Sequence, residues 1–476
     1  MSTETTRQRT RPDRDAPDPR RWRILAVSLI VGFMALLDVS IVNIAIPSMQ
    51  QGLHTSAGSI QWVVSGYALT FGLVLVAGGR LGDAYGRRRM MLIGLAGFVV
   101  ASAGVGLAPS AAAVIVARLV QGLAAGLLTP QNSGLIQQLF RGAERGRAFG
   151  LFGFTVSVSA ALGPVLGGLI LALAGEDVGW RYLFLINVPI GLVALVFVAR
   201  LVPGRTEAVS GDPGLDIGGA VLLGLLVLDV LYPVVRLESD EYWSLALLAL
   251  APPLGWGFVR WERRVRERGR PPLLDLSLLG RIRGYASGIT IGTLYFTGFT
   301  GIILTSSFYL QDGLGVGPLH AGLLVAPYAV GAAISAPVAG NLVSSVGRRI
   351  TVAALSAVLV GVAVYAVLAP SRSVDGLWWV AVPALLFAGL GGGAVVSPNL
   401  TLSLAEVPPA MGGAAGGALQ TGQRIGSSIG AAVLMTAYST IAKRASPGWG
   451  LRGALITGLV AVVAALAVAV RDWRRD

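Results

Sequence analysis

Long apolar segments separated by short polar ones run along almost the whole chain. A helix rises 1.5 Å per residue, so about 20 apolar residues can cross the roughly 30 Å of hydrocarbon in a bilayer. These segments are too long for a β-barrel, whose strands alternate over about ten residues. The pattern therefore predicts an all-α integral membrane protein with fourteen transmembrane helices, at about residues 24–47, 60–79, 90–108, 111–137, 148–173, 181–201, 216–235, 242–260, 284–309, 317–343, 350–369, 377–401, 412–437 and 451–470.

The basic residues are distributed unevenly between the two sides of these predicted helices. With an even number of spans, both termini lie on one side, and 29 of the 37 Lys and Arg residues lie there too. Cytoplasmic loops carry an excess of Lys and Arg, so this bias predicts a protein of the cytoplasmic membrane with both termini in the cytoplasm. Residues 1–22, rich in Arg, Asp and Pro, are expected to form a disordered cytoplasmic tail.

Two short patterns occur twice along the chain. The pattern G-x-L-x-D-x-x-G-R-R at 79–88 recurs with Ser in place of Asp at 340–349, a shift of 261 residues. T-P-Q at 129–131 is echoed by S-P-N at 397–399, a shift of 268 residues. Parallel repeats of this kind are typical of transporters, whose site lies between the halves near the midplane. We expect two six-helix bundles separated by an inserted pair of helices with their linkers, over residues 23–202, 203–270 and 271–476.

Composition narrows the class further. The chain is 54% hydrophobic and only 13% charged, about half the charged fraction of a soluble protein, which excludes a soluble enzyme of ordinary type. It has no Cys and two His, so we expect neither a metal site nor any other cofactor. The net charge of +13 would suit nucleic-acid binding, but the basic residues flank the spans, and no nucleic-acid partner is expected.

A few charges lie inside the apolar segments. A charge at mid-bilayer costs a few kcal/mol and by default marks a transport pathway. Asp38 and Arg118 lie about 13 and 11 Å below the outer ends of their helices, at similar depth in one half. They are expected to pair or to share a proton-dependent contact, which would make them the proton-coupling residues. The alternative is a static ion pair that only fixes helix packing.

Two other intramembrane charges differ in their expected roles. Arg424 falls near the middle of its helix between Gln420, Gln423 and Ser427, and its insertion cost favours a position facing the substrate cavity. Asp229 lies near the end of the first inserted helix. We expect Asp229 near the outer interface, in a structural role.

The helix predicted at 148–173 carries small residues at three- and four-residue steps, typical of close helix packing. Pro164 removes a backbone donor and is expected to kink this helix. We therefore predict a conformational hinge there, formed by Gly163, Pro164, Gly167 and Gly168. A plain packing face is the alternative.

The loop after the second predicted helix combines an acid with arginines and glycines. Asp83 can face the positive N-terminus of a neighbouring helix and pair with Arg87 or Arg88. Such a contact would act as a cytoplasmic latch that closes the inner side, and the glycines of the motif, Gly79 and Gly86, are assigned to the same latch. The alternative is an arginine cluster that only orients the helices.

Together these motifs resemble the fourteen-helix drug:proton antiporters of the major facilitator superfamily. The segment 37–47 resembles the helix 1 signature, with Ser40 where Thr is usual, and the loop at 79–88 resembles the superfamily motif, with Ala84 where a basic residue is common. The remaining matches are R-L-V-Q-G at 118–122, G-P-x-x-G-G at 163–168, Q-W-x-x-x-x-Y at 61–67 and W-R-x-x-F-x-I-N-x-P-x-G at 180–191.

The resemblance implies a monomeric antiporter that exports lipophilic drugs, antibiotics or dyes by alternating access. Protons would be the coupling ion. The residues 317–343 contain no carboxylate, which favours neutral or monovalent substrates, although Arg118 and Arg424 would also tolerate anionic amphiphiles. We expect the substrate cavity to be lined by polar and aromatic residues of both halves, namely Asn43, Trp62, Tyr67, Gln121, Gln131, Asn399, Gln423 and Arg424.

Two other functions compete with drug export. The first is export of an endogenous metabolite or lipid precursor by the same mechanism. The second is a membrane enzyme or sensor, which the short loops disfavour because they leave no room for a soluble domain. The chain also lacks the G-x-x-x-x-G-K-[ST] motif that cradles phosphates, so ATP-driven transport is disfavoured.

Overall fold

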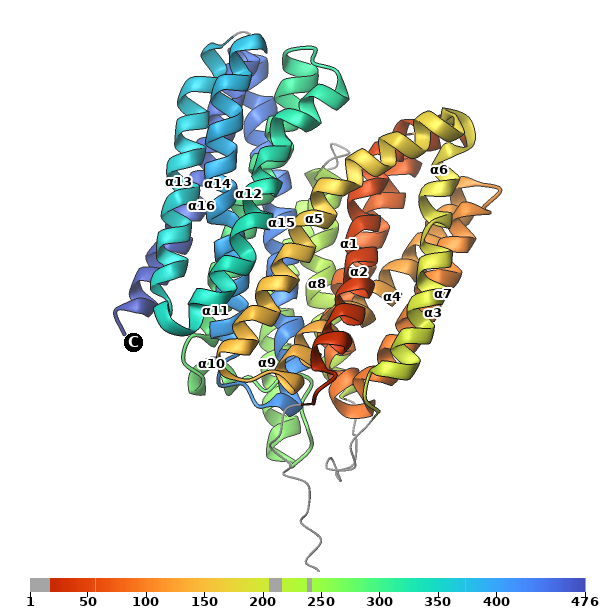
Figure 1. Cartoon of the computed structure of the whole chain (residues 1–476), viewed down its shortest axis with the longest axis vertical. Coiled ribbons are helices and arrows are strands. Elements are labelled where there is room, and N and C mark those ends of the chain that lie inside the picture. The colour runs from red at the N-terminus through yellow and green to blue at the C-terminus, as the bar shows by residue number, and fades with distance from the viewer. Residues whose placement is uncertain (1–17, 56, 205–215, 238–241, 373, 476) are drawn as a thin grey trace, which may run out of the picture.

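The computed structural model describes residues 18–55, 57–204, 216–237, 242–372 and 374–475. Most of the predicted tail 1–22 and part of the linker after residue 202 therefore lie outside the described residues. The described residues form α-helices joined by short connections (Figure 1). Those of the first half are α1 (Arg21–Gly52), α2 (Ala57–Tyr85), α3 (Arg87–Gly106), α4 (Ala111–Leu139), α5 (Gly142–Ala174), α6 (Glu176–Leu185) and α7 (Asn187–Leu201).

The second half begins after a short helix, α10 (Leu278–Arg281). Its first helix, α11, ends in one π-helical turn, η2 (Tyr309–Gly313), and two 3-10 turns, η3 (Ala369–Ser371) and η4 (Pro409–Met411), lie in later connections. The long helices are α11 (Tyr285–Phe308), α12 (Pro318–Val346), α13 (Arg349–Leu368), α14 (Val374–Ser403), α15 (Gly412–Arg444) and α16 (Pro447–Trp473).

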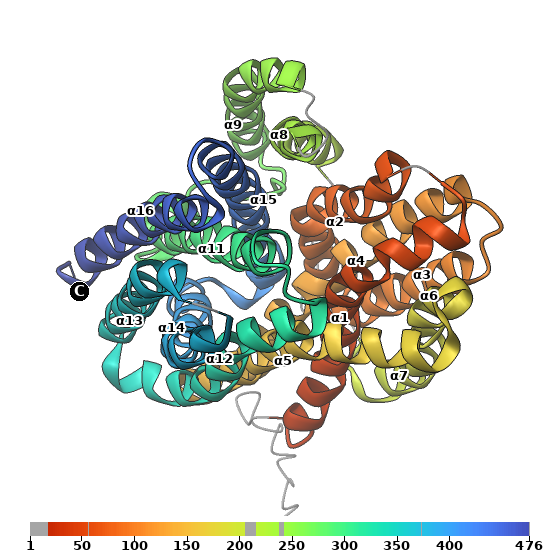
Figure 2. The same cartoon turned by 90° about the horizontal axis from the view of Figure 1, so that it is seen from above.

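The helices gather into two groups, seen side by side from above in Figure 2. Each group has its own apolar interior: one cluster around Phe98 and Leu128 in the first half, and one around Tyr365 and Leu385 in the second. A third cluster joins the halves where α1 begins and α16 ends, the lower end in Figure 1, which we call the terminal end. The halves are therefore held together by apolar packing at the terminal end.

The prediction of fourteen transmembrane helices is wrong. Among the described residues, twelve helices are long and apolar enough to cross a membrane, and they correspond to twelve of the predicted segments. The two predicted segments at 216–235 and 242–260 do not form helices of this kind. They form α8 (Ile217–Leu237), the 3-10 helix η1 (Tyr242–Leu250) and α9 (Ala251–Glu267).

Length and charge explain this correction. The apolar part of α8, Ile217–Pro233, is 17 residues and would rise only about 26 Å as a helix. The other segment changes helix type at Leu250, and its final turns carry Arg263, Arg264 and Arg266. The charged end makes α9 amphipathic, unlike a spanning helix. These elements form an accessory hairpin outside the seam between α2 and α15 (Figure 2).

Two buried carboxyl groups meet at the base of this accessory hairpin. Glu262 is 2% exposed, and its Oε2 accepts a hydrogen bond from the Leu274 backbone at 3.3 Å. Asp216 accepts from the Gly219 backbone at 2.8 Å and from the Trp261 indole at 2.7 Å. Burial, and after it the neighbouring charge of Asp216, raises the pKa of Glu262 to about 8. Glu262 therefore holds a proton near neutral pH.

We predict that this proton makes the hairpin base sensitive to pH. The ordinary pKa of Glu is about 4.5, so between about pH 4.5 and 8 the folded hairpin holds a proton that the opened one releases, and its stability falls as pH rises. Hydrogen exchange at the Leu274 amide, corrected for intrinsic rate, should show about tenfold less protection at pH 7 than at pH 6. Glu262→Gln should abolish this difference, whereas Glu267→Gln, at an exposed position of α9, should leave it. An identical pH dependence in Glu262→Gln would contradict the prediction.

Candidate functional site

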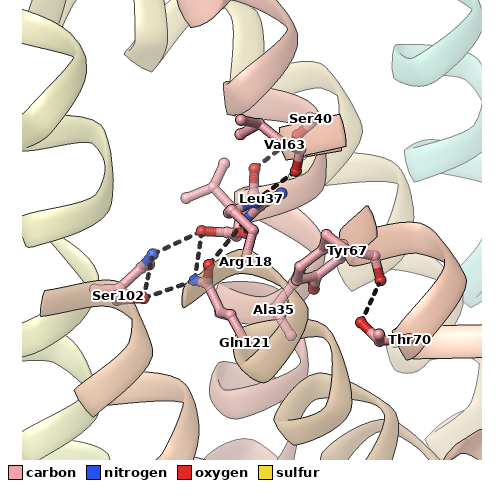
Figure 3. A network of polar contacts seen from close by, with 11 residues as sticks. Ala35, Leu37, Ser40, Val63, Tyr67, Thr70, Ser102, Arg118 and Gln121 are labelled. Atoms are coloured by element: carbon pink, nitrogen blue, oxygen red, sulfur yellow. Dashed lines mark hydrogen bonds and ion pairs between the residues drawn. The ribbon is translucent and has the colours of Figure 1, made fainter. Parts of the chain in front are cut away.

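A buried ion pair lies at the centre of the first half. Asp38 on α1 and Arg118 on α4 are each 1% exposed, and Arg118 Nη1 contacts Asp38 Oδ2 (Figure 3). The same Nη1 donates to Gln121 Oε1 at 2.8 Å, and Arg118 Nε donates to the Val63 carbonyl at 3.0 Å. The guanidinium therefore keeps two acceptors besides the carboxylate. Loss of the negative charge on Asp38 would leave Arg118 still hydrogen-bonded.

Side-chain amides complete the coordination of the carboxylate. Gln121 Nε2 and Asn187 Nδ2, from α4 and α7, each donate to Asp38 Oδ1 at 3.0 Å. Both amides also contact the Ser102 hydroxyl on α3, at 2.7 and 3.4 Å. Charge-assisted hydrogen bonds of this kind offset part of the desolvation cost of a buried charge. The Asp38 carboxyl group is therefore buried with partners on both of its oxygens.

Aromatic rings extend the site toward the second half. The Arg118 guanidinium lies 4.1 Å from the centroid of the Tyr67 ring, and Tyr67 stacks on Phe71 at 5.9 Å with an interplanar angle of 8°. On α15, Arg424 lies 4.6 Å from the centroid of Phe71. Cations and rings attract because the ring face is electronegative. The two arginines thus lie at the two ends of one stack, which we call the arginine–aromatic stack.

The other predicted cavity residues lie elsewhere. Trp62 packs on Tyr232 of the accessory hairpin at 6.3 Å. Gln131 is fully buried and donates to the Gly78 carbonyl at 2.8 Å. Gln423 lies against α11 beside Gly292. The side chain of Asn43 lies outside the described side chains. In this conformation, Tyr67, Gln121 and Arg424 are the predicted cavity residues that the structure brings into the network of Asp38 or its aromatic extension.

Asn399 belongs to a second polar cluster, at the terminal end of the second half. It is 1% exposed, accepts from Arg348 Nη1 at 3.0 Å and donates to the Gly288 carbonyl at 2.8 Å. Arg348 also pairs with Asp472 at 2.8 Å. Asn399 thus ties α14 to α11 and to the second copy of the G-R-R loop, as Gln131 ties α4 to α2. The two echoed motifs each place an amide against a backbone carbonyl of another helix in the same half, but the helices differ: Gln131 bonds the second helix of its half, and Asn399 bonds the first helix of its half.

Part of the predicted hinge packs against α1. A Cβ at Gly163 would overlap the Ser40 side chain, whose hydroxyl donates to the Ser159 carbonyl at 2.9 Å. Gly167 is buried, whereas Gly168 is exposed and a Cβ there would meet nothing within 4 Å. The side chain of Pro164 lies outside the described side chains. Close packing with α1 therefore rests on Gly163, within the continuous helix α5.

The predicted latch residues lie between the halves at the terminal end. The Asp83 side chain is 0% exposed and accepts from the backbone N–H groups of Gly413 and Ala414, at 3.0 and 2.9 Å, where α15 begins. Arg87 pairs with Asp83 at 2.8 Å and donates to the Pro409 carbonyl at 2.7 Å. This arrangement places a carboxylate on the positive end of a helix of the other half.

The glycines of the loop make this contact possible. A Cβ at Gly79 would overlap the Gly413 carbonyl, so only glycine allows this approach of α2 to α15. Gly86 has a φ of 97°, which favours glycine. Arg88 is half-buried and, among the described residues, forms no ion pair with Asp83. Arg87, and not Arg88, is the partner of Asp83.

Four residues of the site escaped assignment from the sequence. Phe184, whose ring centroid lies 5.4 Å from the Arg118 guanidinium, and Asn187 belong to a motif found in the sequence, but the motif alone gave them no role. Ser102 and Phe71 lie in apolar segments where a lone Ser or Phe is unremarkable. Their contacts join positions such as Asn187 and Asp38, which lie 149 residues apart. A polar residue facing inward at the depth of Asp38 was the one signal that could have found Ser102.

Two bundles of membrane-crossing helices with a buried ion pair at mid-depth define a membrane transporter, not an enzyme. Residues 28–431 match the profile of the Major Facilitator Superfamily. The chain therefore belongs to the Major Facilitator Superfamily. The predictions of a multi-pass membrane protein and of a transporter are confirmed; the finer assignment to its fourteen-helix branch is not.

Comparisons of the chain with individual proteins support this family membership. The chain is 35% identical over 434 residues to a "Probable actinorhodin transporter" of Streptomyces coelicolor, covering 90% of this chain and 75% of that one. It is 35% identical over 428 residues to "Puromycin resistance protein pur8" of Streptomyces alboniger, covering 88% and 82%. The solved structure of the proton:xylose symporter XylE has the same fold, with a TM-score of 0.66, 15% identity, and 93% and 94% of the two chains covered.

We predict that enlarging Gly79 loosens the terminal end. Overpacking costs about 1–3 kcal/mol, so Gly79→Val should shift the contact toward an open form by about fivefold or more. The chain has no Cys, so Ser133→Cys, at a buried position facing Gln420, gives a clean reporter. Its reaction with a water-soluble maleimide should accelerate in Gly79→Val.

Gly322→Val is the matched control, because a Cβ added at this exposed position of α12 meets nothing within 4 Å. It should leave labelling of Ser133→Cys unchanged. Equal labelling rates in the two glycine variants would rule out Gly79 as a contact that closes the terminal end.

Proposed function

We propose that this chain is a proton-coupled antiporter that exports lipophilic drugs, antibiotics or dyes across the cytoplasmic membrane. The observation that carries the proposal is the buried Asp38–Arg118 pair, a titratable group held at mid-depth in a transporter fold. The relatives support export of antibiotics, because two of them are named for an antibiotic transporter and an antibiotic resistance protein.

The geometry around Asp38 supports proton exchange. When Asp38 takes up a proton, Arg118 retains the Val63 carbonyl, the Gln121 oxygen and the Tyr67 ring as partners. Protonation therefore removes one attraction between α1 and α4 without orphaning the guanidinium. A substrate that approaches the arginine–aromatic stack competes with the Asp38 carboxylate for the charge of Arg118. Proton and substrate thus favour opposite states of one site, which is the requirement for antiport.

The distribution of basic residues supports an orientation of the protein in the membrane, and the contacts between the halves support a conformational state. We propose that the terminal end faces the cytoplasm, since most basic residues lie on that side. The contacts of Arg87, Gln137 and Arg145 with backbone carbonyls at 404–409 all lie at this end. With this orientation the structure corresponds to a state closed to the cytoplasm. Opening it requires release of the Asp83 latch.

In this proposal the two halves rock about α5, and each half moves as one body. The division at residues 203 and 270 separates these bodies from the accessory hairpin. Gly163 against α1 is the hinge position with a close contact to support it. The site is built from helices of one chain, so a monomer suffices, with protons as the coupling ion and no cofactor.

We predict that Asp38→Asn abolishes proton-coupled export. The amide keeps a similar shape and can accept hydrogen bonds, but it cannot exchange a proton. In vesicles with an imposed pH gradient, gradient-driven efflux of a lipophilic dye should fall to the level of vesicles without the protein. The rate of dye exchange at equal pH on both sides should persist, which shows that the variant is folded and binds substrate.

The matched control is Asp229→Asn. Asp229 is a second acid in an apolar helix, 8% exposed, but it belongs to the accessory hairpin. Its replacement should leave gradient-driven efflux within about twofold of the wild type. Full gradient-driven efflux by Asp38→Asn would refute the assignment of Asp38 and, with it, the proposed coupling.

A further inference from the structure

Arg424 is a cation without an acid beside it. It lies in the middle of α15 and is half-buried. Within the part of the chain that the structure describes, no carboxylate pairs with Arg424 and no side chain or carbonyl accepts a hydrogen bond from it. Asp38 is engaged by Arg118, and Asp83 by Arg87 and α15. A guanidinium at this depth without a counter-ion is costly, and a bound anion would supply that counter-charge.

The neighbours of Arg424 place it between the two halves. Phe71, over whose ring it lies, belongs to α2 of the first half. One turn earlier on α15, Gln420 donates to Ser133 of α4 at 3.0 Å. Three residues later, Ser427 accepts from Thr300 of α11 at 3.0 Å. Arg424 therefore lies on the side of α15 that faces the first half, where a transporter of this architecture binds substrate.

The ring of Phe71 holds the Arg424 guanidinium in an orientation that suits anion binding. Stacking on a ring occupies one face of the planar group and leaves its edge N–H donors free. Phe71 is itself 3% exposed and held by its stack on Tyr67, so this support is rigid. A planar fork of donors matches the geometry of a carboxylate or sulfonate. The half-buried rings of Phe296 and Phe299 on α11 supply apolar surface in the second half.

We propose that Arg424 is the substrate-binding residue that selects lipophilic organic anions, binding their carboxylate, sulfonate or ionised phenol group. The inference rests on the proposed export function and names its substrate class. Binding of such an anion supplies the missing counter-charge of Arg424. Arg424 is thus a specificity residue, distinct from the Asp38–Arg118 pair, and it shares the arginine–aromatic stack with that pair.

The test compares two fluorescent probes with the same aromatic skeleton. 8-Anilinonaphthalene-1-sulfonate carries a sulfonate, and N-phenyl-1-naphthylamine is neutral. Both are titrated into the purified full-length protein in a neutral detergent. Arg424→Gln should weaken binding of the sulfonate about tenfold or more, the usual value of a hydrogen bond to a charged group, and change binding of the neutral probe less than about twofold. Arg424→Lys should restore part of the sulfonate affinity, because it restores the charge but not the fork.

Arg452→Gln is the matched control. Arg452 is also half-buried and also lies over a ring, 5.0 Å from the centroid of Trp449, but it lies near the start of α16, where its Nη2 donates to the Val367 carbonyl at 3.0 Å. Its replacement should leave both probes unaffected. Binding of the neutral probe also reports folding, so an Arg424→Gln protein that loses both probes equally would show a structural role and overturn the proposal. Unchanged binding of the sulfonate would overturn it too.

A phospholipid phosphate has the same charge as these substrates, and a further arm separates the two. Phosphatidylglycerol added at low mole fraction should not displace the sulfonate probe. Displacement that depends on Arg424 would assign the anion to a lipid headgroup and overturn the substrate proposal. Gradient-driven dye efflux, measured separately, tests export itself. Intact efflux with no role of Arg424 in probe selectivity refutes only this inference, whereas absent efflux with Arg424-dependent selectivity refutes only the export proposal.

Discussion

The burial of one ion pair away from water governs the organisation of the first half. Two opposite charges in a low-dielectric interior are stable only when their geometry is good and their remaining hydrogen-bonding groups are satisfied. Here Asp38 and Arg118 take those partners from four helices, through Ser102, Gln121 and Asn187 as well as the Val63 carbonyl on α2. The same contacts that make the charges tolerable also hold α1, α2, α3, α4 and α7 at one depth.

The interface between the halves has a different character. Its polar contacts use helix ends and backbone carbonyls, such as Asp83 on the first N–H groups of α15 and Gln137 on the Leu404 carbonyl. These groups can be hydrated when the halves separate, so the cost of opening is moderate. Glycines such as Gly79 bring the backbones close without interlocking side chains. A rigid half and a reversible interface are the two mechanical requirements of alternating access.

Most of the helices were predictable because membrane crossing is a local property. Twelve of the predicted segments correspond to twelve spanning helices, since hydrocarbon thickness sets helix length directly. The accessory hairpin was not predicted correctly, because hydropathy alone does not distinguish an apolar helix that packs on the outside of a bundle from one that crosses the bilayer. The short apolar part of α8 and the arginines that end α9 decided between them.

By itself, the sequence determined that this chain is a helical membrane protein of a transporter family, and it singled out Asp38, Arg118 and Arg424 because a charge in lipid is costly wherever it occurs. Only the tertiary structure decided which groups surround those charges. Asn187 reaches Asp38, and Gln131 and Asn399 turn to backbone carbonyls, through contacts between distant segments that no local pattern encodes. The same holds for Arg424, whose cost was evident from its position but whose contact with Phe71 of the other half emerged only once the helices around it were packed.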